Sequence, residues 1–153
     1  MTFPRKGWPA AAVFGATLLA LAGCVQPPVV TPAASPIPPG QARLWFYRPY
    51  QPSVSFNLAN IDLNGARIIS VPAYGPAVYR DVAPGNYVIA PEGEVESPGQ
   101  AVGVSVAPAQ EMFFEIDDSP IVEGDRNVYQ RDVFYVKPVP PAIARAQLGL
   151  NPR

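Results

Sequence analysis

Short stretches of alternating apolar and polar residues recur along the chain from residue 42 onward, and turn-forming residues separate them. In the first stretch, Leu44 and Phe46 fall on one face of an extended strand, whereas Arg43, Trp45 and Tyr47 fall on the other. Similar patterns occur at 60–63, 66–69, 77–82, 87–90, 102–106, 112–117 and 133–136. The period of two predicts seven or eight short β-strands.

The dipeptide Asn64-Gly65 separates two of these stretches. Both central residues of a type I′ turn need positive φ, and Asn-Gly adopts it at little steric cost. A two-residue turn fixes the register of a hairpin, so the apolar pairs share one face and an ion pair lies on the other. The expected cross-strand pairs are Leu63–Ala66, Asp62–Arg67 and Ile61–Ile68.

Two Pro-Gly dipeptides mark further turns. Pro84 sets φ at the second turn position and Gly85 supplies positive φ at the third, which predicts a type II turn. The segment 97–100, Ser-Pro-Gly-Gln, repeats this pattern.

The frequent turns and the 21 prolines among 153 residues argue against long helices. We therefore expect an all-β fold, a single antiparallel β-sandwich of seven or eight strands. Residues 142–150 place Ile143, Ala146 and Leu150 on one side of a short C-terminal helix. Such a short helix is not stable alone, so it either docks on the domain or frays.

The first segment has the layout of a bacterial export signal. Arg5 and Lys6 form a short basic region, and an uncharged run extends from Ala10 to Ala22. As a helix this run spans about 20 Å, less than the roughly 30 Å core of a bilayer, which favours a secretory signal over a permanent span. The run ends in the tetrapeptide Leu-Ala-Gly-Cys at residues 21–24, which resembles the lipobox of bacterial lipoproteins.

The lipobox resemblance implies that Cys24 receives a diacylglycerol, that residues 1–23 are a cleaved signal peptide, and that the new amino terminus is acylated. Several acyl chains, palmitate among them, would attach the mature chain firmly to a membrane. Because Val25 and not aspartate follows the cysteine, the resemblance implies the outer membrane, with the domain facing the periplasm. The alternative is an incidental thiol in a plain signal peptide.

A tether follows the lipobox. Residues 24–41 hold the cysteine and six prolines without any charge, a composition that favours extended polyproline II over a packed fold. At about 3.1 Å per residue, the segment from Val25 to Gln41 reaches on the order of 50 Å. The composition changes at Ala42, which sets the expected boundaries at 42–139 for the sandwich domain and 140–153 for the C-terminal tail or helix.

A second resemblance covers residues 42–117 and rests on three motifs in order. They are the Asn64-Gly65 hairpin, Val82-x-Pro84-Gly85-x-Tyr87, and Val104-x-Val106-x-Pro108-x-Gln110-x-x-Phe113-Phe114. The order resembles a domain family of unknown function that is common in bacterial lipoproteins and, more distantly, prealbumin-like sandwich modules. One departure is Ala109, where that family usually has glycine. The resemblance implies a fold and an envelope location, and it transfers no catalytic or ligand residues.

Composition excludes several kinds of chemistry. The chain has no histidine, which rules out Ser-His-Asp and Cys-His catalysis and the usual zinc and copper sites. Cys24 is the single cysteine, so no intramolecular disulfide forms. The net charge of −1 provides no basic field for nucleic acid. Lys137 is the one lysine after Cys24 and has no serine-lysine motif near it. We expect no cofactor.

Carboxylates are the remaining reactive groups. Glu92, Glu94 and Glu96 alternate and would share one face of a strand, where like charges favour solvent. Residues 111–125 hold six acids, which indicates a solvated acidic loop. Calcium is the alternative, but the spacing does not match an EF-hand. The weak metal candidates are Asp117, Asp118, Glu123 and Asp125.

Trp45, Tyr47 and Phe113 fall on the strand face opposite the apolar stripe. Either a second layer such as the C-terminal segment covers them, or they form a contact patch for a partner. The missing catalytic groups favour a non-enzymatic, lipid-anchored envelope lipoprotein whose sandwich binds an envelope protein or helps assemble a complex. The alternative is a carboxylate-dependent glycan hydrolase, which needs two acids roughly 5–9.5 Å apart in a cleft.

Overall fold

The computed structural model describes residues 34–49, 57–92, 99–123 and 129–150, and of 119–123 and 129–132 it describes the backbone alone. The described residues form eight strands followed by one short helix. In chain order these are β1 (Ala42–Tyr47), β2 (Ala59–Leu63), β3 (Ala66–Val71), β4 (Val78–Val82), β5 (Gly85–Pro91), β6 (Val102–Val106), β7 (Glu111–Glu123), β8 (Tyr129–Val139) and α1 (Pro141–Gln147).

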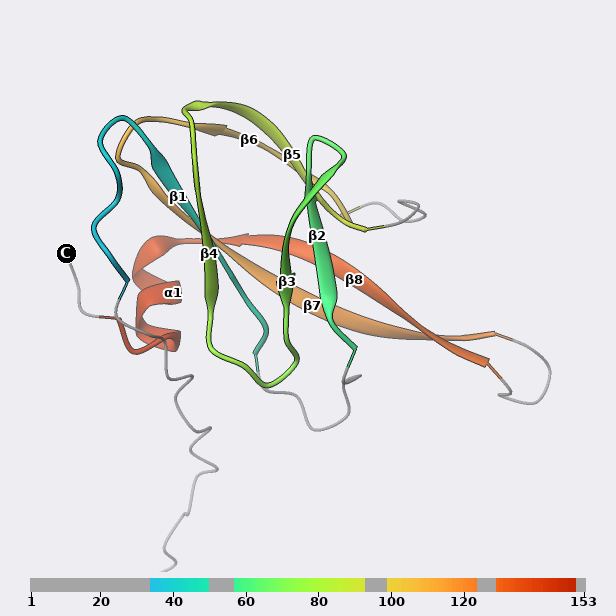
Figure 1. The fold of residues 1–153 in the computed structure, drawn as a ribbon. Helices are drawn as coiled ribbons and strands as arrows, with labels where there is room; N and C mark the ends of the chain where they lie inside the picture. The colour runs from blue at the N-terminus through green and yellow to red at the C-terminus, as the bar shows by residue number, and fades with distance from the viewer. Residues whose placement is uncertain (1–33, 50–56, 93–98, 124–128, 151–153) are drawn as a thin grey trace, which may run out of the picture.

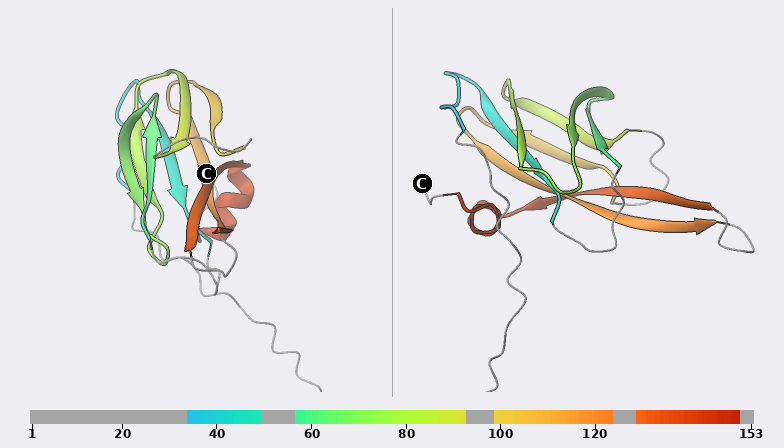
Figure 2. Two further views of the ribbon diagram at one scale, coloured as in Figure 1. Left: turned by 90° about the vertical axis from the view of Figure 1, so that its right-hand side faces the viewer. Right: turned by 60° about the horizontal axis from the view of Figure 1, so that its bottom comes forward.

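The strands of the described residues form two four-stranded sheets (Figure 1). Sheet A has the order β4-β1-β7-β8 and sheet B the order β3-β2-β5-β6. The two sheets lie face to face as separate layers (Figure 2). This confirms the predicted β-sandwich. The one departure from antiparallel pairing is β1, which runs parallel to β7.

The apolar stripes predicted from the period of two meet between the sheets. Leu44 and Phe46 of β1 and Phe114 of β7 are fully buried and face Ile61 and Ile89 of sheet B. The rings of Phe46 and Phe114 stack with centroids 5.4 Å apart. Since full burial of such a side chain contributes about 1.5–3 kcal/mol, this layer is the main source of stability.

The Asn64-Gly65 turn is confirmed, because both residues have positive φ, 50° and 78°. Leu63 pairs with Ala66 and Asp62 with Arg67, as predicted. Beyond them the prediction is wrong, because an irregularity between Ile61 and Asp62 shifts the ladder by one residue. Ile61 therefore lies opposite Ile69 and not opposite Ile68.

The predicted ion pair between Asp62 and Arg67 is also wrong. Arg67 forms its salt bridge with Glu92, which follows the neighbouring strand β5. The carboxylate of Glu92 also accepts a hydrogen bond from the side-chain amide of Asn60 at 2.7 Å. The competing carboxylate of Glu92 draws Arg67 away from the residue opposite it in the ladder.

Gly85 does not form the predicted type II turn. Its φ is not positive, and it is the first residue of β5, where it pairs with Val106. A side-chain contact closes this turn instead, since the Tyr87 hydroxyl donates to the carbonyl of Ala83 at 2.7 Å. Gly99 does have positive φ, 87°, and the two residues before it lie outside the described part of the chain.

Strands β7 and β8 are much longer than the alternating segments that predicted them. They pair continuously from Phe113–Val139 to Glu123–Tyr129 and extend beyond the other strands as a two-stranded ribbon (Figures 1 and 2). Most of the acid-rich segment is therefore strand, and the expected acidic loop at 111–125 is wrong for residues 111–123. On β7, Glu111, Glu115 and Asp117 share one face and Asp118 lies on the other. The acids are spread along an extended strand, and those described do not gather as metal ligands.

The C-terminal segment forms α1 and docks on the sandwich rather than fraying. Pro141 begins the helix, as its fixed φ and missing N–H allow. Ala144 and Leu148 are buried against the outer face of sheet A, whereas Ile143 is 54% exposed. Of the three residues predicted to share a buried side, Leu150 packs against this cluster, whereas Ile143 and Ala146 are exposed.

Candidate functional site

The aromatic residues of the candidate contact patch lie under α1. Trp45 and Tyr47 are each 2% exposed and Phe113 is 1% exposed. The rings of Trp45 and Phe113 are nearly parallel at 2°, with centroids 6.1 Å apart. Ala144 and Leu148 cover them from above. The alternative of an open contact patch is wrong for these residues, because a second layer packs on this face.

The N-terminal end of the described chain covers the neighbouring part of the same face. Arg43 is fully buried, and its guanidinium donates to both carboxylate oxygens of Asp81 at 2.7 and 2.8 Å. Its remaining nitrogen donates to the carbonyl of Ser35 at 2.6 Å. The guanidinium also lies 3.9 Å from the ring centroid of Tyr79, and the Ser35 and Tyr79 hydroxyls are 3.2 Å apart.

This arrangement, the Arg43 clamp, satisfies a buried charge completely. The hydrogen bond to Asp81 raises the pKa of Arg43, so the guanidinium stays charged. Removing one partner of such a buried pair typically costs about 3–5 kcal/mol. The alternating pattern placed Arg43 on the outward face but did not indicate its burial. The apolar and aromatic neighbours of Arg43 in residues 43–47 were the sequence signal that could have indicated its burial.

Polar side chains hold α1 in place around the aromatic layer. The Tyr47 hydroxyl donates to the side-chain oxygen of Gln147 at 2.6 Å. Arg145 forms an ion pair with Glu111, whose other oxygen accepts from the Trp45 indole at 3.4 Å. Burial, followed by the charge of Glu115, raises the pKa of Tyr47, so its hydroxyl remains a donor.

The candidate metal-binding acids do not form a site in the described residues. Asp117 pairs with Lys137, and the hydrogen bond to Asp117 raises the pKa of that lysine. Asp118 lies on the opposite face, 3.4 Å from Arg48, and both side chains are 2% exposed. The side chain of Glu123 and all of Asp125 lie outside the described structure. Within it, no three acidic, cysteine or histidine side chains gather as metal ligands.

The acids of the second candidate cluster are only partly described. Glu92 pairs with Arg67 at the surface, whereas Glu94 and Glu96 lie outside the described residues. Cys24 also lies outside them.

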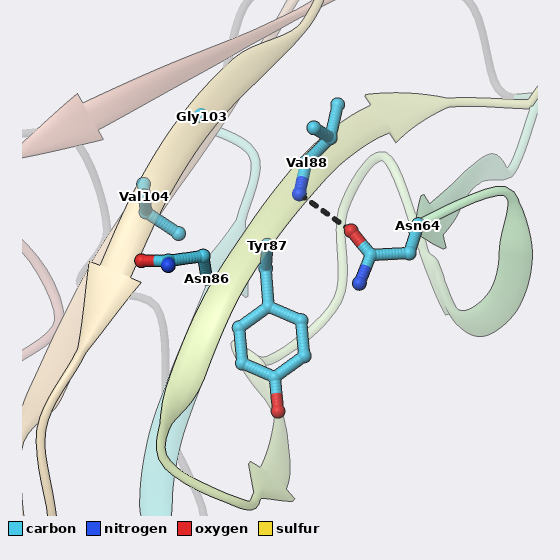
Figure 3. A pocket seen from close by; sticks show the side chains of 6 residues that line it. All are labelled: Asn64, Asn86, Tyr87, Val88, Gly103 and Val104. Atoms are coloured by element: carbon cyan, nitrogen blue, oxygen red, sulfur yellow. Dashed lines mark hydrogen bonds between the residues drawn. The ribbon is translucent and has the colours of Figure 1, made fainter.

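Sheet B carries a shallow pocket that the sequence did not indicate. Its volume is about 360 Å³, and it lies beside β5 and β6 near the β2–β3 turn (Figure 3). Val88 is the large apolar side chain at this site and is 53% exposed. The lining residues are Asn64, Asn86, Tyr87, Val88, Gly103 and Val104. The glycine within the valine alternation of residues 102–106 was the signal that could have located it.

No family model and no curated protein matches this chain. The described residues contain no helix that is both long and apolar enough to span a bilayer.

Proposed function

We propose that the protein is a lipid-anchored lipoprotein of the bacterial cell envelope whose β-sandwich is a non-enzymatic binding or assembly module. The observation that carries this proposal is the Leu-Ala-Gly-Cys tetrapeptide at residues 21–24, directly after a short basic region and an uncharged run. Val25 after the cysteine favours the outer membrane, with the domain in the periplasm.

The Arg43 clamp supports this proposal and shortens the expected tether. Because the Ser35 carbonyl is bound to Arg43, the segment available as a tether is at most residues 24–35 rather than 24–41. Even fully extended, that segment spans at most about 40 Å. The Arg43 clamp on the outer face of sheet A would therefore stay within about 40 Å of the lipid attachment point.

The pairing of the described acids supports a non-enzymatic module over a glycan hydrolase. A general acid needs a carboxyl whose pKa is raised in a cleft beside a second free carboxylate. Asp81, Asp117 and Asp118 instead each pair with a basic side chain. Among the described acids, Glu115 of β7 has a raised pKa, owing first to burial and then to the charge of Asp117. That neighbouring carboxylate is not a free one, because Asp117 pairs with Lys137.

The test is metabolic labelling of the full chain with palmitate. Wild type should incorporate label and fractionate with membranes, whereas Cys24→Ser should incorporate none. Gly23→Ala is the matched control, because it keeps a small residue before the cysteine and should remain labelled. Equal labelling of wild type and Cys24→Ser would exclude this lipid attachment and with it the proposed anchoring.

A further inference from the structure

Strand β6 forms an edge of sheet B, with β5 as its neighbour in the described structure. The backbone of β5 shows which peptide groups of β6 face the open side. The amide of Asn64 donates to the Val88 carbonyl at 2.8 Å. The Val88 amide donates to the Asn64 side-chain oxygen at 2.8 Å (Figure 3). The N–H and the C=O of Val88 therefore both point toward β2.

Because these groups alternate along an antiparallel strand, those of Tyr87 point the other way, toward β6. Tyr87 is opposite Val104, so Val104 directs its N–H and C=O inward to β5. It follows that Gly103 and Ser105 direct theirs outward, to the open edge. These groups provide hydrogen-bonding positions for an additional strand.

The edge of β6 lacks the features that usually block strand addition. Charged side chains and proline protect sheet edges. The other edge strands of the described sheets all carry them: Arg67 in β3, Arg80 and Asp81 in β4, and Lys137 and Pro138 in β8. The sequence of β6, Val-Gly-Val-Ser-Val, has neither. An extended segment that pairs with β6 therefore meets no charged side chain on β6 itself.

The pocket of Figure 3 adjoins this edge. Gly103 pairs with Val88 across β5 and β6, and apart from Gly103 and its two chain neighbours no described residue comes within 4 Å of the position that a Cβ on Gly103 would take. A strand added to β6 would place the side chain opposite Gly103 next to this empty space. That side chain could extend over the glycine to reach the exposed Val88, with Asn86 and Asn64 at the rim.

We propose that β6 binds an extended segment of a partner protein by strand addition, with a bulky apolar or aromatic side chain of the partner opposite Gly103. In this recognition mode backbone hydrogen bonds supply affinity and side-chain pockets supply specificity. A second copy of the chain fits less well. Antiparallel self-pairing centred on Val104 uses the same outward groups but places the short side chain of Ser105 opposite Gly103, which leaves the pocket unfilled.

This inference gives the partner class for the binding module and rests on the proposed function only for the compartment. The probe is a synthetic nine-residue peptide of alternating threonine and valine with one central phenylalanine and a lysine at each end. It is titrated into the ¹⁵N-labelled full chain in detergent micelles, and amide shifts are followed by NMR. We expect shifts at residues 102–106 and at Val88. A peptide with glycine at the centre should bind about tenfold more weakly, as expected for loss of an aromatic anchor.

Variants of β6 test the backbone geometry. Ser105→Pro removes an N–H that faces solvent, so the fold should persist while peptide binding is lost. Val104→Pro is the control, because it removes an N–H bonded to β5 and should lower the melting temperature much more. Ser105→Lys keeps the backbone but charges the edge, and it should also weaken binding. Gly103→Tyr should fill the pocket and remove the preference for phenylalanine.

Three results would overturn the proposal. They are peptide shifts away from β6, peptide binding that is unchanged by both Ser105 variants, and concentration-dependent dimerisation through β6 without peptide. The last would identify a second copy as the occupant. Because these readouts do not depend on acylation, failure here is distinguishable from failure of the palmitate experiment.

Discussion

Replacing Trp45 with alanine tests whether the second layer over sheet A is part of the folded domain. The indole is 2% exposed, and its centroid lies 6.1 Å from that of Phe113 and 4.9 Å from that of Tyr79. Its loss removes the transfer free energy of the side chain and leaves a cavity, which together cost about 3–5 kcal/mol. This is a large part of a typical domain stability of about 5–15 kcal/mol. At roughly 4 °C or more per kcal/mol for a domain of about this size, the melting temperature should fall by more than about 10 °C.

Thermal unfolding followed by circular dichroism measures this effect. The matched control is Ile143→Ala, on α1 itself, because Ile143 is 54% exposed and exposed substitutions usually change stability by about 0.5 kcal/mol or less. Leu148→Ala, at a buried position of the same helix, should resemble Trp45→Ala. A melting temperature of Trp45→Ala within about 2 °C of wild type would refute the reasoning and reopen this face as a contact surface.

Three further predictions concern turns and a buried acid. Gly65→Val forces a β-branched residue into φ of 78° and should cost about 1–3 kcal/mol of stability. Gly85→Val should cost far less, because its Cβ would meet the Tyr87 ring at an ordinary 3.8 Å. Equal melting temperatures for the two variants would contradict the turn assignment. Ala109→Gly should raise the melting temperature, because Ala109 has φ of 59°, a conformation that costs a non-glycine residue about 1–2 kcal/mol. Glycine adds unfolded-chain entropy that opposes folding by about 0.4–1 kcal/mol, which is the smaller effect. A lower melting temperature would count against this reasoning. Burial and Asp117 raise the pKa of Glu115 above its ordinary 4.5, so the folded state holds this proton more tightly and the contribution of Glu115 to stability falls as pH rises above about 4.5. In Glu115→Gln, the melting temperature should fall less steeply with rising pH than it does in wild type. Identical slopes of melting temperature against pH in the two proteins would disprove this prediction.

The strand pattern predicted most of the fold because its signal is local. The period of two located all eight strands, and Asn64-Gly65 located a turn whose φ values agree. The register beyond the turn depends on an irregularity at Ile61/Asp62, which no local preference of these residues indicates. The predicted type II turn at Gly85 was wrong for a different reason. A local side-chain contact closes the turn, from the Tyr87 hydroxyl to the carbonyl of Ala83 four residues earlier, and Gly85 does not adopt positive φ.

The candidate site was harder to predict because it depends on contacts between distant segments. Arg43 meets Asp81 across 38 positions, and Tyr47 meets Gln147 across 100. The sequence posed the correct alternatives for the aromatic face. It could not decide between them, because docking of α1 depends on the total area that Ala144 and Leu148 bury together. The backbone at Ala109 adopts the positive φ that glycine favours, so glycine would fit this position better than the alanine that is present.

The two ends of the described chain both pack on the outer face of sheet A, and this constrains where a partner can bind. Residues 34–35 and α1 both cover the outer side of sheet A, so an incoming protein would have to displace buried aromatic rings to reach it. On sheet B the edge strand β6 is uncharged and the neighbouring Val88 is already half exposed, so strand addition there displaces no buried side chain. The Arg43 clamp ties the N-terminal segment to sheet A, whereas the β6 edge belongs to the opposite layer of the sandwich. Anchoring and binding would then use different sheets, and variants of Ser105 should change peptide binding without changing palmitate incorporation.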